Sequence, residues 1–236
     1  MNSIIIPVYN NSTFTNQLLN QIKDFNGEII VVNDGSTDNT VEVVARFPKV
    51  KLVSNEKNLG FAKSVNIGYA NSTGEKICFL NNDVKFTGKS LADIDNLFSA
   101  VKENTLSGPT GGFVNPKTFS YEYHTDAINK KINYICGWCL VGTKPTFDKF
   151  MKSGVGPFVE DFETYFEDTY MGYESLKLGV KFRIIRAPFT HFGKVTTSGL
   201  DLRTMFTSAK EKFIEKVKQN FTDDELQRLG KRNGFE

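Results

Sequence analysis

The chain has 236 residues, of which 39% are hydrophobic and 24% charged, and its formal net charge is +2. These values are ordinary for a soluble globular protein and lack the strongly basic balance of a nucleic-acid binder, so we expect no nucleic-acid partner. No apolar run approaches the roughly 20 residues that span a bilayer, and no signal peptide precedes the first apolar run, which predicts a cytoplasmic protein.

Strand and helix patterns alternate through the first half of the chain. Short runs rich in β-branched residues predict strands at residues 3–8, 28–32, 50–54 and 76–80. Apolar residues at helical spacing predict helices at residues 13–25, 38–47, 62–70 and 90–102. This order indicates an α/β fold in which helices flank a mostly parallel central sheet.

The second half of the chain is less regular. We expect strands at residues 108–114, 132–141 and 180–185, and helices at residues 144–152 and 168–178. A polar, aromatic stretch separates the first two of these strands. From Leu202 onward the pattern turns helical, and Thr222 and Glu225 have the spacing of a capping box that opens one more helix.

This pattern predicts one domain with an appendage. Residues 1–199 form the domain, which divides near residue 105, and residues 200–236 form a C-terminal helical extension. Four lysines make one side of the extension basic: Lys210, Lys212, Lys216 and Lys218. We expect the extension to pack on the domain; a homodimer contact and peripheral binding to the inner face of a membrane are the alternatives.

Two of the predicted strands stop at a carboxylate. Residues 28–32 run into Asn33 and Asp34, and residues 76–80 run into Asn81-Asn82-Asp83. In an open α/β sheet, ligands bind beyond the carboxyl ends of the strands. The two acids therefore predict a nucleotide and metal site, although an acid after a strand is also a common turn residue.

Six motifs in order give the chain a resemblance to a known family. They are Pro7-Val8-Tyr9-Asn10, Asn33-Asp34-Gly35-Ser36, Asn58-Leu59-Gly60-Phe61-Ala62, Asn81-Asn82-Asp83, Glu167-Asp168 and His191-Phe192-Gly193. Together they resemble a family 2 glycosyltransferase of the GT-A fold from residue 3 to about residue 199, similar to bacterial rhamnosyltransferases and other glycan-building transferases. The resemblance implies a Rossmann-like nucleotide-binding sheet, with a nucleotide-binding half at residues 1–105 and an acceptor half at residues 106–199.

The resemblance also implies how a nucleoside-diphosphate sugar binds. Asp34 accepts the imide N–H of uracil or thymine, which favours a UDP or dTDP donor. The residues expected to contact the nucleotide are Pro7, Val8, Tyr9, Asp34, Gly60, Lys63 and Asn82. Among these, Gly60 allows a close approach of the backbone, and Lys63 either pairs with phosphate or is a solvated helix charge.

A divalent cation, Mn²⁺ or Mg²⁺, is the implied cofactor. Both ions prefer oxygen ligands in octahedral geometry. Asp83 is the expected carboxylate ligand and His191 the second ligand, although a lone histidine is more often structural. The first acid of the family's D-x-D motif is an amide here, Asn81.

The acidic pair Glu167 and Asp168 is expected on the acceptor side. The resemblance makes Asp168 the general base that takes the proton from the acceptor hydroxyl, a role worth roughly 10²–10⁴-fold in rate. Glu167 and Trp138 are expected to contact the acceptor. The alternatives are that the two acids only stabilise a helix N-terminus and that Trp138 is a core aromatic residue.

The activity implied is inverting, metal-dependent transfer of a sugar to a hydroxyl of a glycan, lipid-linked or protein-linked acceptor. A non-processive enzyme is expected, because the one tryptophan lies outside any Q-x-x-R-W motif. A sugar nucleotidyltransferase is a weaker alternative, since residues 7–11 are not a glycine-rich loop. A non-catalytic nucleotide-sugar or glycan-binding module is disfavoured, because Asp83 and Asp168 are both present.

Overall fold

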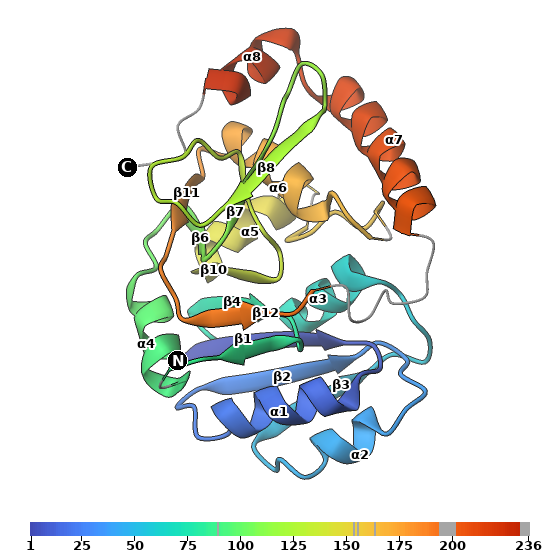
Figure 1. Ribbon diagram of the computed structural model, residues 1–236, viewed down its shortest axis with the longest axis vertical. Coiled ribbons are helices and arrows are strands. Elements are labelled where there is room, and N and C mark those ends of the chain that lie inside the picture. The colour runs from blue at the N-terminus through green and yellow to red at the C-terminus, as the bar shows by residue number, and fades with distance from the viewer. Residues whose placement is uncertain (89, 153, 155, 163, 194–201, 232–236) are drawn as a thin grey trace.

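A seven-stranded sheet forms the centre of the computed structural model, which describes residues 1–88, 90–152, 154, 156–162, 164–193 and 202–231. Its spatial order is β11-β6-β10-β4-β1-β2-β3. The strands are β1 (Asn2–Val8), β2 (Glu28–Asn33), β3 (Val50–Ser54), β4 (Lys76–Leu80), β6 (Thr105–Gly108), β10 (Cys139–Thr143) and β11 (Lys181–Ile184). Within this sheet only β10 runs antiparallel to its neighbours, so the expected mostly parallel α/β sheet is confirmed (Figure 1).

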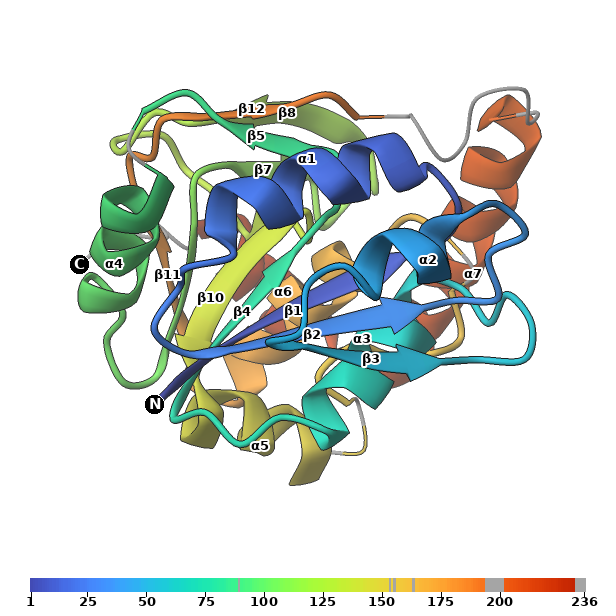
Figure 2. The ribbon, with the colours of Figure 1, turned by 90° about the horizontal axis from the view of Figure 1, so that it is seen from below.

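Helices cover both faces of the sheet, and the alternation of side chains along β1 shows how. Ile4 and Ile6 point into one apolar cluster, together with α1 (Ser12–Ile22), α2 (Thr40–Val44) and α4 (Ser90–Ser99). Ile5 points into the other cluster, with α3 (Phe61–Ala70), α5 (Lys144–Lys152) and α6 (Glu167–Lys177). Successive residues of a strand face opposite sides, and Figure 2 shows α1 and α5 on opposite sides of the sheet.

Two small sheets were not predicted. One pairs β5 (Val84–Phe86) with β12 (Phe189–His191), and the other has the order β8-β7-β9. The bounds of its strands are Gly111–Val114 for β7, Tyr121–Thr125 for β8 and Tyr134–Ile135 for β9. The continuous strands expected at 108–114 and 132–141 were wrong, because each is divided between the central sheet and this small sheet.

The C-terminal helices pack on the second half of the domain, which follows residue 105. Helices α7 (Leu202–Asn220) and α8 (Asp223–Lys231) bury Phe213, Val217 and Leu229 against Tyr170 and Tyr173 of α6, in a third apolar cluster. The contact of the extension with the domain is therefore confirmed for these residues, and Figure 1 shows α7 lying along one side of the second half of the domain.

The capping box is confirmed. The Thr222 N–H donates to Glu225 Oε2 over 2.8 Å, and the Glu225 N–H donates to Thr222 Oγ1 over 3.3 Å. The domain boundary expected near residue 199 falls among residues 194–201, which lie outside the described residues. None of the described helices combines the length and the apolar character that crossing a bilayer requires.

Candidate active site

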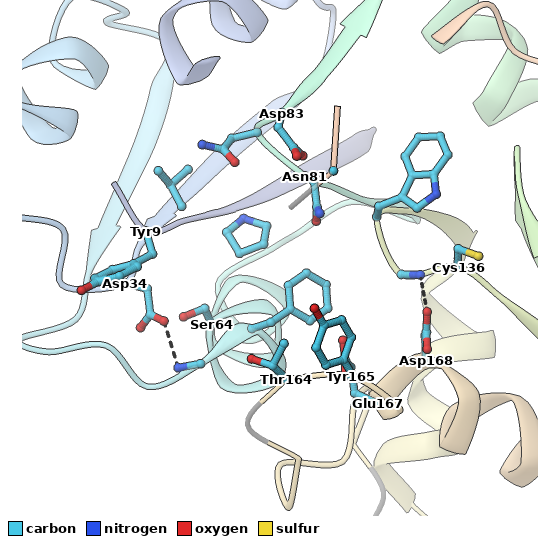
Figure 3. A pocket seen from close by; sticks show the side chains of 18 of the residues that line it. Tyr9, Asp34, Ser64, Asn81, Asp83, Cys136, Thr164, Tyr165, Glu167 and Asp168 are labelled. Atoms are coloured by element: carbon cyan, nitrogen blue, oxygen red, sulfur yellow. Dashed lines mark hydrogen bonds between the residues drawn. The ribbon is translucent and has the colours of Figure 1, made fainter. Parts of the chain in front are cut away.

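A cavity of about 500 Å³ opens beyond the carboxyl ends of β1, β2 and β4. Most of the residues that the sequence analysis assigned to the site line it: Pro7, Val8, Tyr9, Asp34, Gly60, Asn82, Asp83, Trp138, Glu167, Asp168 and His191. Lys63 does not line the cavity and is exposed on α3. Figure 3 shows Asp83 and Asp168 on two sides of the same space.

At the carboxyl end of β2, the carboxylate of Asp34 holds the loop that leads into α3. Its Oδ1 atom accepts the Leu59 N–H and the Asn55 amide, each over 2.8 Å, and its Oδ2 atom accepts the Gly60 N–H over 2.9 Å. Gly60 has a φ of 90°, which side chains of L-residues rarely permit. Asp34 therefore shapes the wall of the cavity in addition to facing it.

The two amides before Asp83 differ in their contacts. Asn82 is buried and donates through Nδ2 to Thr15 Oγ1 of α1 over 3.0 Å. The Oδ1 atom of Asn81 is buried and has no hydrogen-bond partner among the described residues. Since a buried acceptor without a partner is costly, Asn81 is suited to accept a hydrogen bond from a ligand in the cavity.

Asp83 and His191 come together through the small sheet that the sequence analysis missed. In the pairing of β5 with β12, His191 lies opposite Val84, the residue after Asp83. Asp83 Oδ1 lies 3.2 Å from His191 Nε2. Both atoms are buried, and neither makes a hydrogen bond within the described part of the chain.

This pair fits a divalent cation. Two adjacent ligands of an octahedral ion with bonds of about 2.1 Å are about 3 Å apart, close to the observed separation. The described residues contain no group of three or more His, Cys, Asp or Glu side chains that could hold a metal ion. Few protein ligands are usual for Mg²⁺, which keeps several waters and binds substrate phosphates.

Trp138 covers His191. The indole and imidazole rings are stacked with centroids 4.6 Å apart and planes inclined by 7°. Trp138 also lines the cavity, but one face of its ring is occupied by His191, which leaves less of it for the acceptor contact that the sequence predicted.

Asp168 accepts two hydrogen bonds in the first turn of α6. The Gly137 N–H donates to its Oδ2 atom over 2.9 Å, and the Thr169 hydroxyl donates to its Oδ1 atom over 3.2 Å. Burial raises the pKa of Asp168, and these hydrogen bonds oppose the rise because they stabilise the charged form.

Glu167 has the opposite environment. Its Oε2 atom is buried and has no hydrogen-bond partner among the described residues. Burial and the negative charge of Asp168 raise the pKa of Glu167 to about 8. The pair therefore holds one proton near neutral pH, and the hydrogen bonds to Asp168 favour its placement on Glu167.

His124 is a cavity residue that the sequence analysis missed. It lies on β8, and its Nε2 atom is 2.7 Å from the Tyr134 hydroxyl. Burial lowers the pKa of His124, and the nearby Asp168 charge opposes that shift. The available signal was weak, since β8 has only five residues and is largely exposed.

Thr164 and Tyr165 also line the cavity and were not predicted. Tyr165 and Phe166, which precede the acidic pair, have φ angles of 70° and 69°. Left-handed backbone in bulky residues costs on the order of 1–3 kcal/mol each, so the surrounding structure must hold this turn.

Solved structures with similar folds include two glycosyltransferase complexes. The mannosyltransferase PcManGT from Pyrobaculum calidifontis, in complex with GDP-Man and Mn²⁺, has a TM-score of 0.70 and 16% identity, over 97% of this chain and 68% of that chain. S. aureus TarS 1-349 in complex with UDP-GlcNAc has a TM-score of 0.67 and 17% identity, over 97% and 70%. The expected GT-A fold is thereby confirmed.

Curated relatives match a shorter segment. The dolichyl-phosphate beta-glucosyltransferase ALG5C of Trichomonas vaginalis is 33% identical over 96 residues, 34% of this chain and 28% of that protein. An uncharacterized glycosyltransferase of Rickettsia bellii is 41% identical over 90 residues, 36% of this chain and 13% of that protein. The matched segment thus covers less than a third of either relative. Residues 3–151, more than half of the chain, match the model of glycosyl transferase family 2, and the chain therefore belongs to that family.

Proposed function

We propose that the protein transfers a sugar from a nucleoside-diphosphate sugar to a hydroxyl group of a glycan, lipid-linked or protein-linked acceptor, with inversion at the anomeric carbon. One observation carries the proposal: a single cavity is lined by the Asp83 and His191 pair and by the Glu167 and Asp168 pair. The first pair suits the departing diphosphate, and the second suits the incoming hydroxyl.

In the proposed reaction, the acceptor oxygen forms a bond to the anomeric carbon while the bond from that carbon to the diphosphate oxygen breaks. Asp168 takes the hydroxyl proton, and the electron pair of the broken bond leaves on the diphosphate. Attack from the face opposite the diphosphate inverts the anomeric centre. A positioned carboxylate base contributes roughly 10²–10⁴-fold to such a step.

Asp83 Oδ1 and His191 Nε2 are the atoms that would hold the cation. A bound Mn²⁺ or Mg²⁺ supplies Lewis-acid stabilisation of the negative charge on the leaving diphosphate. The two orphaned atoms support this assignment, since each is buried without a hydrogen-bond partner among the described residues.

The remaining residues bind and orient the substrates. Protonated Glu167 donates a hydrogen bond to an acceptor oxygen, which places the hydroxyl beside Asp168. Pro7, Val8 and Tyr9 face the nucleoside, and Asp34 favours a uridine or thymidine donor. The solved complexes of similar fold contain GDP-Man and UDP-GlcNAc, so the choice of nucleotide is left to the test.

A screen of nucleotide sugars with the purified protein tests the proposal. A donor in the presence of Mn²⁺ should raise the melting temperature by mass action and be hydrolysed slowly to the nucleoside diphosphate. A melting shift without any hydrolysis would indicate a binding module, and a requirement for a nucleoside triphosphate would indicate a nucleotidyltransferase. No shift and no hydrolysis with any donor would overturn the proposal.

A further inference from the structure

Helix α7 lies beyond the family-matched segment, yet it contacts the turn that leads into the acidic pair. The Phe206 ring is 5.6 Å from the Tyr165 ring and 5.1 Å from the Phe166 ring, measured between centroids. About two turns further along the same face of α7, Phe213 stacks on Phe166 with centroids 5.0 Å apart and planes inclined by 23°. Two aromatic rings of α7 thus enclose Phe166.

The enclosed turn decides where α6 begins. Phe166 caps the helix, and its carbonyl oxygen accepts the Tyr170 N–H over 2.8 Å. The next two residues, Glu167 and Asp168, form the first turn. Since both Tyr165 and Phe166 have left-handed backbone, the turn keeps its shape only while neighbouring groups hold it.

We propose that α7 is a positioning element of the transfer site, in which Phe206 holds the Tyr165–Phe166 turn and thereby sets Glu167 and Asp168 against the cavity. The inference deepens the proposed function and rests on it where turnover is the readout. Phe206 touches the catalytic pair only through the turn, so its role is positioning.

The exposure of Phe206 separates this role from simple packing. Phe213 and Val217 are fully buried and already fasten α7 to the acceptor half, and an ion pair between Lys216 and Asp161 adds to that contact. Phe206 remains 38% exposed, so it contributes little to the core. Its ring nevertheless meets both residues of the turn, one of which lines the cavity.

Phe206→Ala is the central variant. We expect its melting temperature to stay within a few degrees of wild type and its affinity for UDP with Mn²⁺ to stay within about twofold, while donor turnover falls about tenfold, because small misplacements of catalytic groups are costly. Phe206→Tyr keeps the ring and should restore turnover. Met151→Ala removes a side chain of similar exposure, 50%, outside the cavity and serves as the control.

A second readout needs no substrate: the ¹³C NMR titration of the side-chain carboxyl groups. When the turn loosens, water reaches the pair, so the pKa of Glu167 should move from about 8 toward its ordinary value in Phe206→Ala. The other titratable groups that face the pair lie on β8, on β9 and between β9 and β10, and are Tyr121, His124, Tyr134 and Cys136.

The outcomes are distinct. An unchanged carboxyl titration in Phe206→Ala overturns the positioning role. If wild type is active, turnover of Phe206→Ala equal to that of wild type also overturns it. If wild type turns over no nucleotide sugar while the titration shifts, the proposed function fails and the positioning role stands. If Phe206→Ala does not fold, Phe206→Leu replaces it in the titration, and a wild-type curve there overturns the inference.

Discussion

The indole of Trp138 lies flat against the imidazole of His191, with ring centroids 4.6 Å apart. His191 faces Asp83, and the N–H of Gly137, the residue before Trp138, donates to Asp168. The short link between β9 and β10 therefore contacts both the candidate cation ligands and the candidate base. Trp138 and Gly137, both in this link, can therefore report on a substitution at the Asp83 and His191 pair or at Asp168.

Mn²⁺ should quench the fluorescence of Trp138, because the only tryptophan of the chain stacks on a residue that we assign as a metal ligand. Asp83→Ala should abolish the quenching. His191→Ala should weaken the apparent Mn²⁺ affinity by roughly tenfold or more, since even changes behind a metal ligand cost that much. A fluorescence titration with Mn²⁺, with and without UDP, measures both.

His124→Ala is the matched control for this titration, because His124 is the other histidine of the chain and lies on the acceptor side of the same cavity. It should leave the Mn²⁺ titration unchanged. Quenching that survives in both Asp83→Ala and His191→Ala would reject the two residues as ligands.

Asp168→Asn should lower donor turnover by roughly 10²–10⁴-fold, since an amide cannot take the proton of the acceptor hydroxyl. The amide oxygen can still accept the Gly137 N–H, so the fold and the donor affinity should be kept. The measurement is a comparison of kcat with the affinity for the donor. An equal loss in both would argue against the base assignment, and Asp24→Asn, which changes an exposed acid in the turn after α1, provides the control.

The donor side of the site could be predicted from sequence because its signals are local. Asp34 directly follows β2 and Asp83 comes three residues after β4, two strands whose apolar runs are easy to recognise, and parallel strands bring their carboxyl ends to one edge of a sheet. The pairing of β5 with β12 could not be predicted in this way. Each strand has only three residues, and about a hundred residues of chain separate them.

The acceptor side depends on contacts between distant segments. Tyrosine and phenylalanine disfavour left-handed backbone, so nothing local indicates the turn at Tyr165 and Phe166. The raised pKa of Glu167 arises from packing around a carboxyl group that by its position in the sequence suggested only a helix N-terminus. His124 enters the cavity on a strand whose polar pattern resembles a loop.

Glu167→Gln should change how stability depends on pH. The pKa of Glu167 is raised on folding from 4.5 to about 8, so between these values the unfolded state loses the proton while the folded state keeps it. The contribution of Glu167 to the free energy of unfolding of wild type is therefore fully present below about pH 4.5, and it is lost as the pH rises to about 8. Glutamine cannot titrate, so the variant lacks this loss. Its melting temperature should therefore rise relative to that of wild type as the pH increases across this window.

Thermal unfolding in a series of buffers from pH 4 to pH 9 measures that difference. The gap between variant and wild type should widen through the window and stay constant above about pH 8. A gap that is the same at every pH would mean that Glu167 is ionised in the folded protein near neutral pH. The proposed hydrogen bond from Glu167 to the acceptor would then be wrong.

Asp34→Asn and Lys63→Ala should affect donor affinity very differently. The asparagine variant turns its NH₂ group toward either the Leu59 N–H or the Gly60 N–H, because the two donate to different oxygens of Asp34, so it loosens the loop before α3 and leaves one oxygen fewer for a base imide. We expect its affinity for UDP, measured by calorimetry, to fall about tenfold or more, in line with roughly 1–3 kcal/mol for each buried donor left unpaired.

Lys63 is exposed and outside the cavity lining, so the affinity of Lys63→Ala for UDP should stay within about twofold of wild type. A tenfold loss in Lys63→Ala would show instead that this lysine reaches a phosphate group when the donor binds, and wild-type affinity in Asp34→Asn would remove Asp34 from the nucleotide site.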